Sequence, residues 1–191
     1  MKTTKQKLME AIVDLVAEKG FRAVTTLEIA QRAGVGEKTL FRNFSNKLSL
    51  LEEACNQVYY AAEFKVIIEN ELVYDLKKDL MLIFTQYHLI ANKNRKILMI
   101  ALKEEDQLPE LRKKILEHPK SLLNDLVAYL DEMIRRNLMR KTDTRVAALL
   151  MVTAQYGAFI NHLNSKRNFP DISLEEYIES SVEIFTKGLL L

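Results

Sequence analysis

The feature that most constrains the fold is a sharp corner between two short helical patterns in the first quarter of the chain. The segment "EIAQRAGVGEKTLFRNF" places Gly34, Val35 and Gly36 between them, although all 191 residues include only five glycines. Gly34 can take the left-handed backbone that ends a helix, and Gly36 can cap the next helix. Two short helices joined in this way need a structural reason, because short helices have little stability of their own.

The composition favours an all-α fold. Glycine and proline total eight residues, too few for a chain built from strands and turns, and 48% apolar with 28% charged residues fits a globular protein. The apolar spacing from Leu8 to Val16 predicts an amphipathic helix that ends at Gly20. Thr25 followed by Glu28 predicts a capping box at the start of the second helix.

Further helical patterns continue to the C-terminus. Ser45 is expected to cap a long fourth helix, and Pro109 and Pro119 are each expected to begin a helix. We therefore predict two domains. Residues 1–46 form a three-helix helix-turn-helix unit, and residues 47–191 form a larger helical domain (about nine helices).

Positive charge is concentrated in the predicted helix-turn-helix region. Residues 1–50 contain nine Lys or Arg against five Asp or Glu, whereas the rest of the chain contains nineteen against twenty-one. The second helix of this motif enters the major groove of DNA, where Arg, Lys and Asn side chains read bases or bind phosphates. With Leu40 and Phe44 facing inward, we expect the DNA contacts to be made by Thr25, Thr26, Lys38, Thr39, Phe41, Arg42, Asn43 and Lys47. The alternative is an ordinary solvated helix in which Arg42 pairs with a carboxylate.

The segment "TTLEIAQRAGVGEKTLFRNFSNKLSLL" resembles the DNA-binding region of the TetR family of bacterial transcriptional regulators. The resemblance covers residues 5–51 closely and implies that the eight residues above occupy the family's DNA-contact positions. Two positions depart from the family pattern. Phe41 stands where tyrosine is frequent, so apolar contact with sugar or a thymine methyl replaces a phosphate hydrogen bond. Gly36 replaces a common serine cap, which loosens the start of the recognition helix.

The segment "TRVAALLMVTAQYGAFINHL" is apolar on nearly every side, more than a helix covered on one face requires. A single helix-turn-helix reads few base pairs, so such proteins usually dimerise on near-palindromic sites. The resemblance implies a four-helix dimer interface built from the last two helices. The predicted interface residues are Ala154, Gly157, Phe159, Ile160, Tyr177, Ile178, Val182 and Phe185. The alternative is that these residues are core within one chain.

Aromatic and methionine side chains recur through the middle helices. Such side chains can line a mostly apolar cavity that has a few polar anchors, for which Tyr87 and His88 are the first choices. The resemblance implies that these helices enclose a small apolar or amphipathic effector, although a plain core has the same pattern. The predicted ligand-binding residues are Tyr60, Phe64, Phe84, Tyr87, His88, Tyr129, Met133 and Tyr156.

Catalytic and metal motifs are missing from the sequence. His88, His118 and His162 are widely separated, and neither a nucleophile motif nor a phosphate-binding glycine loop is present, so we expect no catalytic residue, metal or cofactor. The single cysteine, Cys55, indicates a reducing compartment. No secretion signal is recognisable and the apolar stretches are too short to cross a bilayer, so we expect a cytoplasmic protein without membrane contact.

These features predict a dimeric, ligand-responsive DNA-binding regulator, most simply a repressor that an effector releases from a palindromic operator. Two alternatives stay open from the sequence. One is a helical protein–protein interaction module whose basic N-terminal segment binds an acidic partner, and the other is an enzyme of an unfamiliar type.

Overall fold

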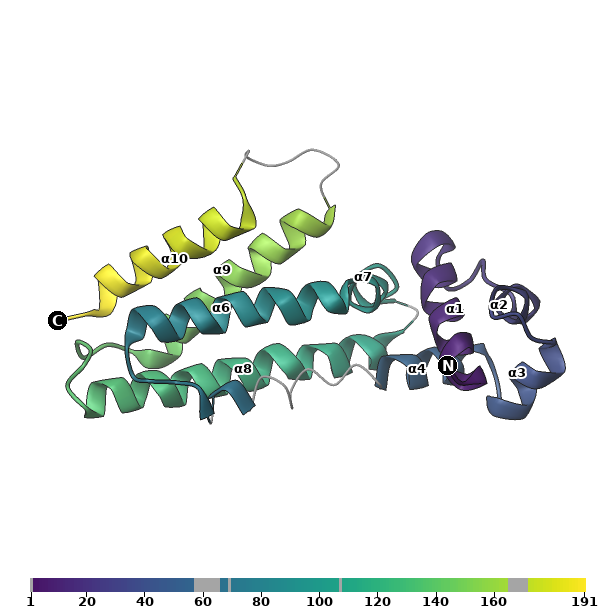
Figure 1. The fold of residues 1–191 in the computed structure, drawn as a ribbon, viewed down its shortest axis with the longest axis horizontal. Coiled ribbons are helices and arrows are strands. Elements are labelled where there is room, and N and C mark those ends of the chain that lie inside the picture. Colours follow the sequence, from purple (N-terminus) through teal and green to yellow (C-terminus); the bar gives the residue numbers. More distant parts are fainter. Residues whose placement is uncertain (1, 57–65, 69, 107, 165–171) are drawn as a thin grey trace. The chain divides into compact units, whose positions relative to one another are not determined.

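The computed structural model describes residues 2–56, 66–68, 70–106, 108–164 and 172–191, with the backbone alone at 114–119 and 162–164. These residues form helices and contain no strand, as predicted (Figure 1). The helices are α1 (Thr4–Lys19), α2 (Thr26–Arg32), α3 (Glu37–Asn43), α4 (Lys47–Asn56), α6 (Leu76–Lys93), α7 (Arg95–Lys103), α8 (Pro109–Arg135), α9 (Thr144–Asn164) and α10 (Leu174–Leu189).

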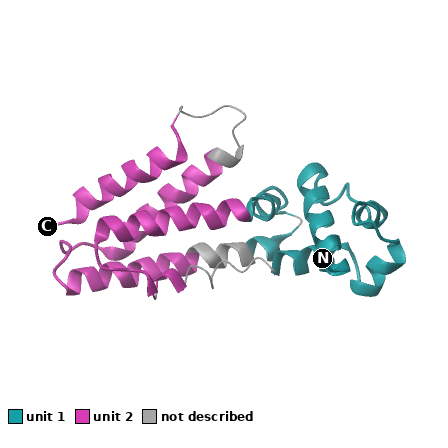
Figure 2. Ribbon diagram, viewed as in Figure 1, with its two compact units in different colours: residues 1–59, 94–115 teal, residues 60–93, 116–191 magenta. Residues whose placement is uncertain are grey.

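The chain divides into two compact units (Figure 2). Unit 1 comprises residues 1–59 and 94–115, and unit 2 comprises residues 60–93 and 116–191. Unit 1 therefore joins the helix-turn-helix region to a segment that is distant in the sequence and contains α7. The sequence-based domain boundary at residues 46 and 47 remains a prediction.

Unit 1 is organised around α1, which packs against α2, α4 and α7. The apolar side of α1 supplies Leu8 and Ile12, and both side chains are fully buried. They share the core with Ile29, Leu40 and Leu50 from the three following helices. Their spacing places the apolar residues of each helix on one side, so burial of that side holds the short helices α2 and α3 in place.

The helix ends in unit 1 follow local sequence signals. Gly20 ends α1 with a φ of 84°, and Gly34 follows α2 with a φ of 68°, a backbone region that favours glycine. Thr25 and Glu28 form the predicted capping box at the start of α2. The corner is closed by the Val35 N–H, which donates to the Ala30 carbonyl at 3.0 Å. These predictions are confirmed.

Two expected helix starts are wrong. Asn46, not Ser45, caps α4, because its Oδ1 accepts the Ser49 N–H at 2.8 Å and its carbonyl accepts the Leu50 N–H. Pro119 does not begin a helix, since α8 runs continuously through it from Pro109 to Arg135. Proline inside a helix removes one backbone hydrogen bond, and the remaining turns of this long helix keep it continuous.

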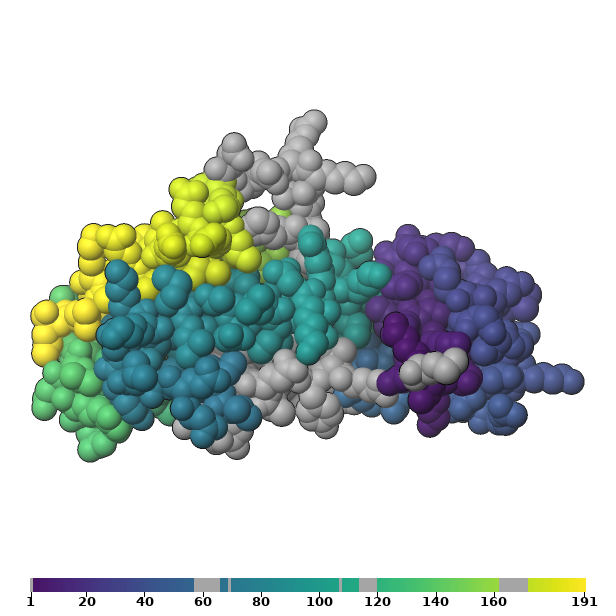
Figure 3. Space-filling model, in the orientation of Figure 1, coloured from purple at the N-terminus to yellow at the C-terminus, as the bar shows by residue number. Residues whose placement is uncertain are grey.

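Unit 2 packs α6 against α9 and α10. The yellow atoms of α10 lie directly on those of α6 in the space-filling view (Figure 3). Phe84 of α6 is buried and meets the ring of Phe185 edge to face, with ring centroids 6.1 Å apart. In the part of the chain that the structure describes, no helix combines the length and the apolar character needed to cross a membrane.

Candidate functional site

One face of helix α3 is exposed to solvent. Lys38 and Arg42 are exposed, and Phe41 between them is 52% exposed although it is a large apolar residue. Positions three and four residues apart lie on the same side of a helix, so these three side chains form one surface. The opposite side holds Leu40 and Phe44, which are buried as predicted. We call Lys38, Phe41 and Arg42 the recognition face.

The helix that carries the recognition face, α3, is held by hydrogen bonds of other residues. The Thr26 hydroxyl donates to Glu37 Oε1 at 2.6 Å, and this bond ties the start of α2 to the start of α3. The Asn43 amide donates to the Thr39 carbonyl at 2.7 Å. Thr26, Thr39 and Asn43 are half-buried, so they contribute local order to α3 in addition to any contact they make with DNA.

Ion pairs fix α2 against α1. Arg32 binds Glu18 through two hydrogen bonds of 3.1 and 3.0 Å, and Lys19 binds Glu28 at 2.7 Å. Hydrogen bonds from Lys19 and from the backbone and hydroxyl of Thr25 lower the pKa of Glu28 to about 2. The Thr25 side chain is therefore engaged as the cap of α2, although Thr25 is exposed at the surface.

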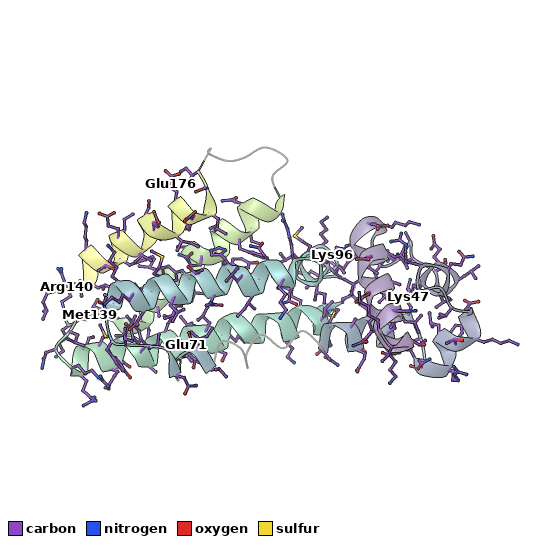
Figure 4. The ribbon with its side chains drawn as sticks, viewed as in Figure 1. Lys47, Glu71, Lys96, Met139, Arg140 and Glu176 are labelled. Carbon is purple, nitrogen blue, oxygen red and sulfur yellow. The ribbon has the colours of Figure 1, made fainter. Side chains whose placement is uncertain are left out.

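Lys47 lies at the start of α4 but makes internal contacts (Figure 4). Its Nζ donates to the carbonyls of Phe21 and Val24, each at 2.6 Å, and lies 4.4 Å from the centroid of the Phe21 ring. Burial lowers the pKa of its ammonium group, an effect that the Glu28 carboxylate partly opposes. The phosphate contact of Lys47 remains a prediction, and the structure gives this side chain an intramolecular role.

The predicted ligand-binding residues of α6 are buried inside unit 2. Phe84, Tyr87 and His88 are almost inaccessible to solvent, and His88 Nε2 lies 3.0 Å from Gln155 Oε1 of α9. Burial, with a smaller effect of Tyr156, raises the pKa of Tyr87 far above its usual value. Gln155 is buried as well, and among the described residues its Nε2 has no hydrogen-bond partner. Sequence reasoning did not select Gln155, since a single glutamine in an apolar helix carries no local signal.

Asp79, which forms a second polar pair with Tyr129 in unit 2, was also not predicted from the sequence. Asp79 is only 1% exposed, and its carboxylate accepts the Tyr129 hydroxyl at 2.7 Å and the Val73 N–H at 3.0 Å. Burial and the neighbouring Asp79 raise the pKa of Tyr129 far above its usual value. Tyr129 is a predicted ligand-binding residue, and its hydroxyl is thus engaged inside the protein. Met133 and Tyr156 are buried and half-buried, whereas Tyr60 and Phe64 lie outside the described residues.

A cavity of about 410 Å³ lies between α6 and α10. His88 is the predicted ligand residue that lines it, and the charged lining residues, Glu175 and Glu179, are both acidic. The other lining residues are Met81, Thr85, Leu89, Asn92, Leu174 and Ile178. The cavity therefore offers a largely apolar surface with a buried imidazole at one side.

Comparison with known proteins agrees with the geometry of unit 1. Residues 8–54 match the family described as "Bacterial regulatory proteins, tetR family". Over 189 residues the chain is 30% identical to the "Uncharacterized HTH-type transcriptional regulator YvkB" of Bacillus subtilis, and the match covers 99% of this chain and 98% of YvkB. The chain belongs to the TetR family.

Two further similar proteins are regulators from Bacillus subtilis. The "Fatty acid metabolism regulator protein" of Bacillus subtilis is 29% identical over 146 residues, which is 74% of each chain. The crystal structure of the transcriptional regulator FadR from Bacillus subtilis in complex with stearoyl-CoA superposes with a TM-score of 0.69. It is 23% identical and the match covers 95% of this chain and 97% of FadR, so it shows the shared fold.

Membership of the TetR family decides the class of protein. TetR-family proteins are transcriptional regulators and not enzymes, so the enzyme alternative is excluded. The same membership favours a DNA-binding regulator over the protein–protein interaction module.

The predicted dimer residues of this TetR-family chain fall into two groups. Phe159, Ile178 and Val182 are buried within unit 2, where they pack inside one chain. The half-buried group comprises Ala154, Gly157, Ile160, Tyr177 and Phe185. The Tyr177 hydroxyl donates to the Ala154 carbonyl at 2.8 Å, which links α10 to α9. Both groups remain predicted interface residues.

The exposed apolar residues of α9 were not selected from the sequence. Val146, Leu149 and Leu150 are each more than half exposed. Gly157 lies further along α9, and an added Cβ there would meet no atom within 4 Å. Val146, Leu150 and Gly157 are spaced by four and seven residues, so they share one side of the helix. We call Val146, Leu149, Leu150 and Gly157 the α9 face.

Proposed function

We propose that this TetR-family regulator binds a near-palindromic operator as a homodimer in the cytoplasm, and that a small apolar or amphipathic effector releases it. In this proposal it acts as a repressor. The observation that carries the DNA-binding part is the recognition face, on which Lys38 and Arg42 flank an exposed Phe41 on a short, braced helix. Such a helix fits the major groove, and its cations match guanine or phosphate.

The three residues of the recognition face have different proposed roles. Arg42 can donate two hydrogen bonds to guanine, which gives sequence discrimination. Lys38 can meet guanine or a phosphate as a point charge. Phe41 supports apolar contact with a thymine methyl or with sugar, because its ring has no hydroxyl for a phosphate.

Replacing Arg42 tests the DNA-binding proposal. The operator is first obtained by selection from random duplexes with the wild-type protein. Arg42→Ala is then expected to reduce discrimination between the selected operator and a scrambled duplex by about 1–3 kcal/mol, because one bidentate base contact is lost. Titrations of both duplexes at fixed salt measure this difference.

The matched control is Arg22→Ala, which removes the same charge from an exposed residue outside α3. It should change binding to both duplexes equally or not at all. If Arg42→Ala and the wild type distinguished the operator from the scrambled duplex equally well, base reading by Arg42 would be excluded. Failure of the wild type to enrich any duplex would contradict DNA binding itself.

The dimer part of the proposal rests on the α9 face. Solvent exposure of Val146, Leu149 and Leu150 on one helix is unfavourable in an isolated chain, and a second copy can cover it. On α10, Ile184 is 69% exposed and can extend the covered surface. A twofold axis would also give two recognition faces for the two halves of a palindrome.

The effector part rests on the buried polar atoms of unit 2. Among the described residues the Gln155 Nε2 donor, adjacent to His88, has no hydrogen-bond partner. An unpaired donor in a core is costly, and an effector oxygen could accept its hydrogen bond. FadR of Bacillus subtilis binds stearoyl-CoA, so long acyl chains are the first class of effector to test. Glu175 and Glu179 would repel the phosphates of CoA, so we expect the acyl chain to enter unit 2 and the CoA group to stay outside.

Effector release can be measured with stearoyl-CoA as the probe. Stearoyl-CoA is expected to dissociate the wild-type protein from its operator, whereas CoA alone should not. Gln155→Leu keeps roughly the side-chain volume but removes the buried amide, both the Nε2 donor and the Oε1 that contacts His88. About tenfold more stearoyl-CoA should then be needed for the same release. Operator binding without effector should stay unchanged. Retention of the operator at saturating stearoyl-CoA would contradict an acyl effector.

A further inference from the structure

We infer that Lys47 and Glu104 are positioning residues that hold the turn between α1 and α2, and thereby set the recognition face for operator binding. We call Gly20, Phe21, Lys47 and Glu104 the Phe21 clamp. All four residues belong to unit 1. The inference rests on the proposed DNA binding but concerns residues that the recognition face does not include.

Lys47 holds the carbonyl side of the turn. Two of its three N–H donors are used by the carbonyls of Phe21 and Val24 at 2.6 Å, and its charge lies over the Phe21 ring. Val24 is buried and immediately precedes the cap residue of α2. The ammonium group therefore fixes the backbone at the point where α2 begins, and one of its three N–H donors remains for a phosphate.

Glu104 holds the amide side of the same turn. It directly follows the last residue of α7, and its Oε1 accepts the Phe21 N–H at 3.1 Å. Gly20 has a φ of 84°, and an added Cβ there would lie only 2.9 Å from Glu104 Oε1. The carboxylate thus occupies the space that a side chain at residue 20 would need. Its Oε2 is buried and has no hydrogen-bond partner among the described residues.

The two contacts meet on one residue from helices that are far apart in the chain. Lys47 is 26 residues from Phe21, and Glu104 is 83 residues from it. Along the chain, α4 leads into unit 2 and α7 follows the first part of unit 2. A displacement of α4 or α7 would therefore move the backbone at Phe21, which lies just before α2.

The clamp and a direct phosphate contact predict different salt dependence for Lys47. Lys47→Met keeps the side-chain length without the donors, and should lower operator affinity about tenfold because two charge-assisted hydrogen bonds are lost. The slope of log affinity against log salt should stay as in the wild type. A phosphate contact would instead reduce that slope by about one.

Replacing Glu104 gives an independent test, because electrostatics and the clamp predict opposite changes in operator affinity. Removing a carboxylate should strengthen DNA binding by simple electrostatics, whereas the clamp predicts that Glu104→Ala weakens operator affinity about tenfold. Asp106→Ala is the matched control, since it removes the same charge from a nearby exposed residue. Glu104→Gln retains an oxygen that can accept the Phe21 N–H, so it should restore most of the affinity.

Amide hydrogen exchange at Phe21 in the DNA-free protein separates failure of the clamp from failure of the proposed function. The Phe21 amide should exchange slowly in the wild type and in Glu104→Gln, and faster in Glu104→Ala. Wild-type protein that binds no duplex would contradict the proposed function, while the exchange data would still test the clamp. The clamp is overturned by unchanged Phe21 exchange in Glu104→Ala, by a reduced salt slope in Lys47→Met, or by equal affinities of Glu104→Ala and Asp106→Ala.

Discussion

Leu150→Glu is expected to give a folded monomer that binds its operator at least about a hundredfold more weakly than the wild type. Leu150 is 59% exposed in the single chain, so a carboxylate there costs little in the monomer. In the proposed dimer the twofold axis places two such carboxylates in an apolar interface, where their desolvation strongly opposes association. The loss of affinity follows because each monomer then holds only half of the palindrome.

Sedimentation velocity at micromolar concentration measures the oligomeric state, and far-UV circular dichroism verifies the fold. The matched control is Leu89→Glu on α6, an equally drastic change at a leucine that is 58% exposed. It should remain a dimer. Phe159→Glu is a second comparison, because Phe159 is only 2% exposed and its substitution should unfold unit 2 rather than produce a monomer. A Leu150→Glu variant that stays dimeric would place the interface elsewhere.

The elements that the sequence predicted well are those specified by neighbouring residues. Gly34 needs a positive φ, and Thr25 needs only Glu28 three residues later to form its capping box. Leu40 and Phe44 face inward because they are four residues apart on a helix. Each of these features depends on interactions within a few residues, so the helix-turn-helix could be located without a structure.

Contacts between distant residues could not be predicted in this way. Lys47 has the same position in the sequence whether it binds phosphate or the Phe21 carbonyl, and Glu104 looks like one of three consecutive acidic residues at the end of a helix. Their roles depend on how α4 and α7 pack against α1, which apolar periodicity does not specify. Asp79 and Tyr129 are a similar case, since 50 residues separate them.

The apolar character of α9 shows a different limit. A helix that is apolar on nearly all sides gives no indication of which side faces its own core and which side faces outward. The sequence selected Phe159 together with Gly157 for the interface, yet Phe159 is buried within the chain. Leu149 and Leu150 are exposed, and only the packing of α9 against α6 and α10 distinguishes the two sets.

Asp79→Ala is expected to lower the free energy of unfolding by about 2–4 kcal/mol, because it leaves the buried Tyr129 hydroxyl and the Val73 N–H without their acceptor. The pair also orders the segment before α6. Tyr74, which has a φ of 60°, stacks on Tyr129 at 6.1 Å, and the Arg136 guanidinium lies 3.4 Å from the Tyr74 ring centroid. Loss of the carboxylate therefore loosens this aromatic group as well.

A series of conservative variants separates the hydrogen bond of Asp79 from packing. Asp79→Asn keeps an oxygen for the Val73 N–H and should cost only about 1 kcal/mol, while Tyr129→Phe should cost about 1.5–3 kcal/mol because a buried carboxylate loses a partner. Tyr87→Phe removes a hydroxyl from another buried tyrosine of unit 2, so it controls for the chemical change itself. Urea unfolding at one fixed protein concentration provides the values, since association would otherwise contribute. If Tyr129→Phe and Tyr87→Phe had equal effects, the Asp79 hydrogen bond would have no special part in the stability of unit 2.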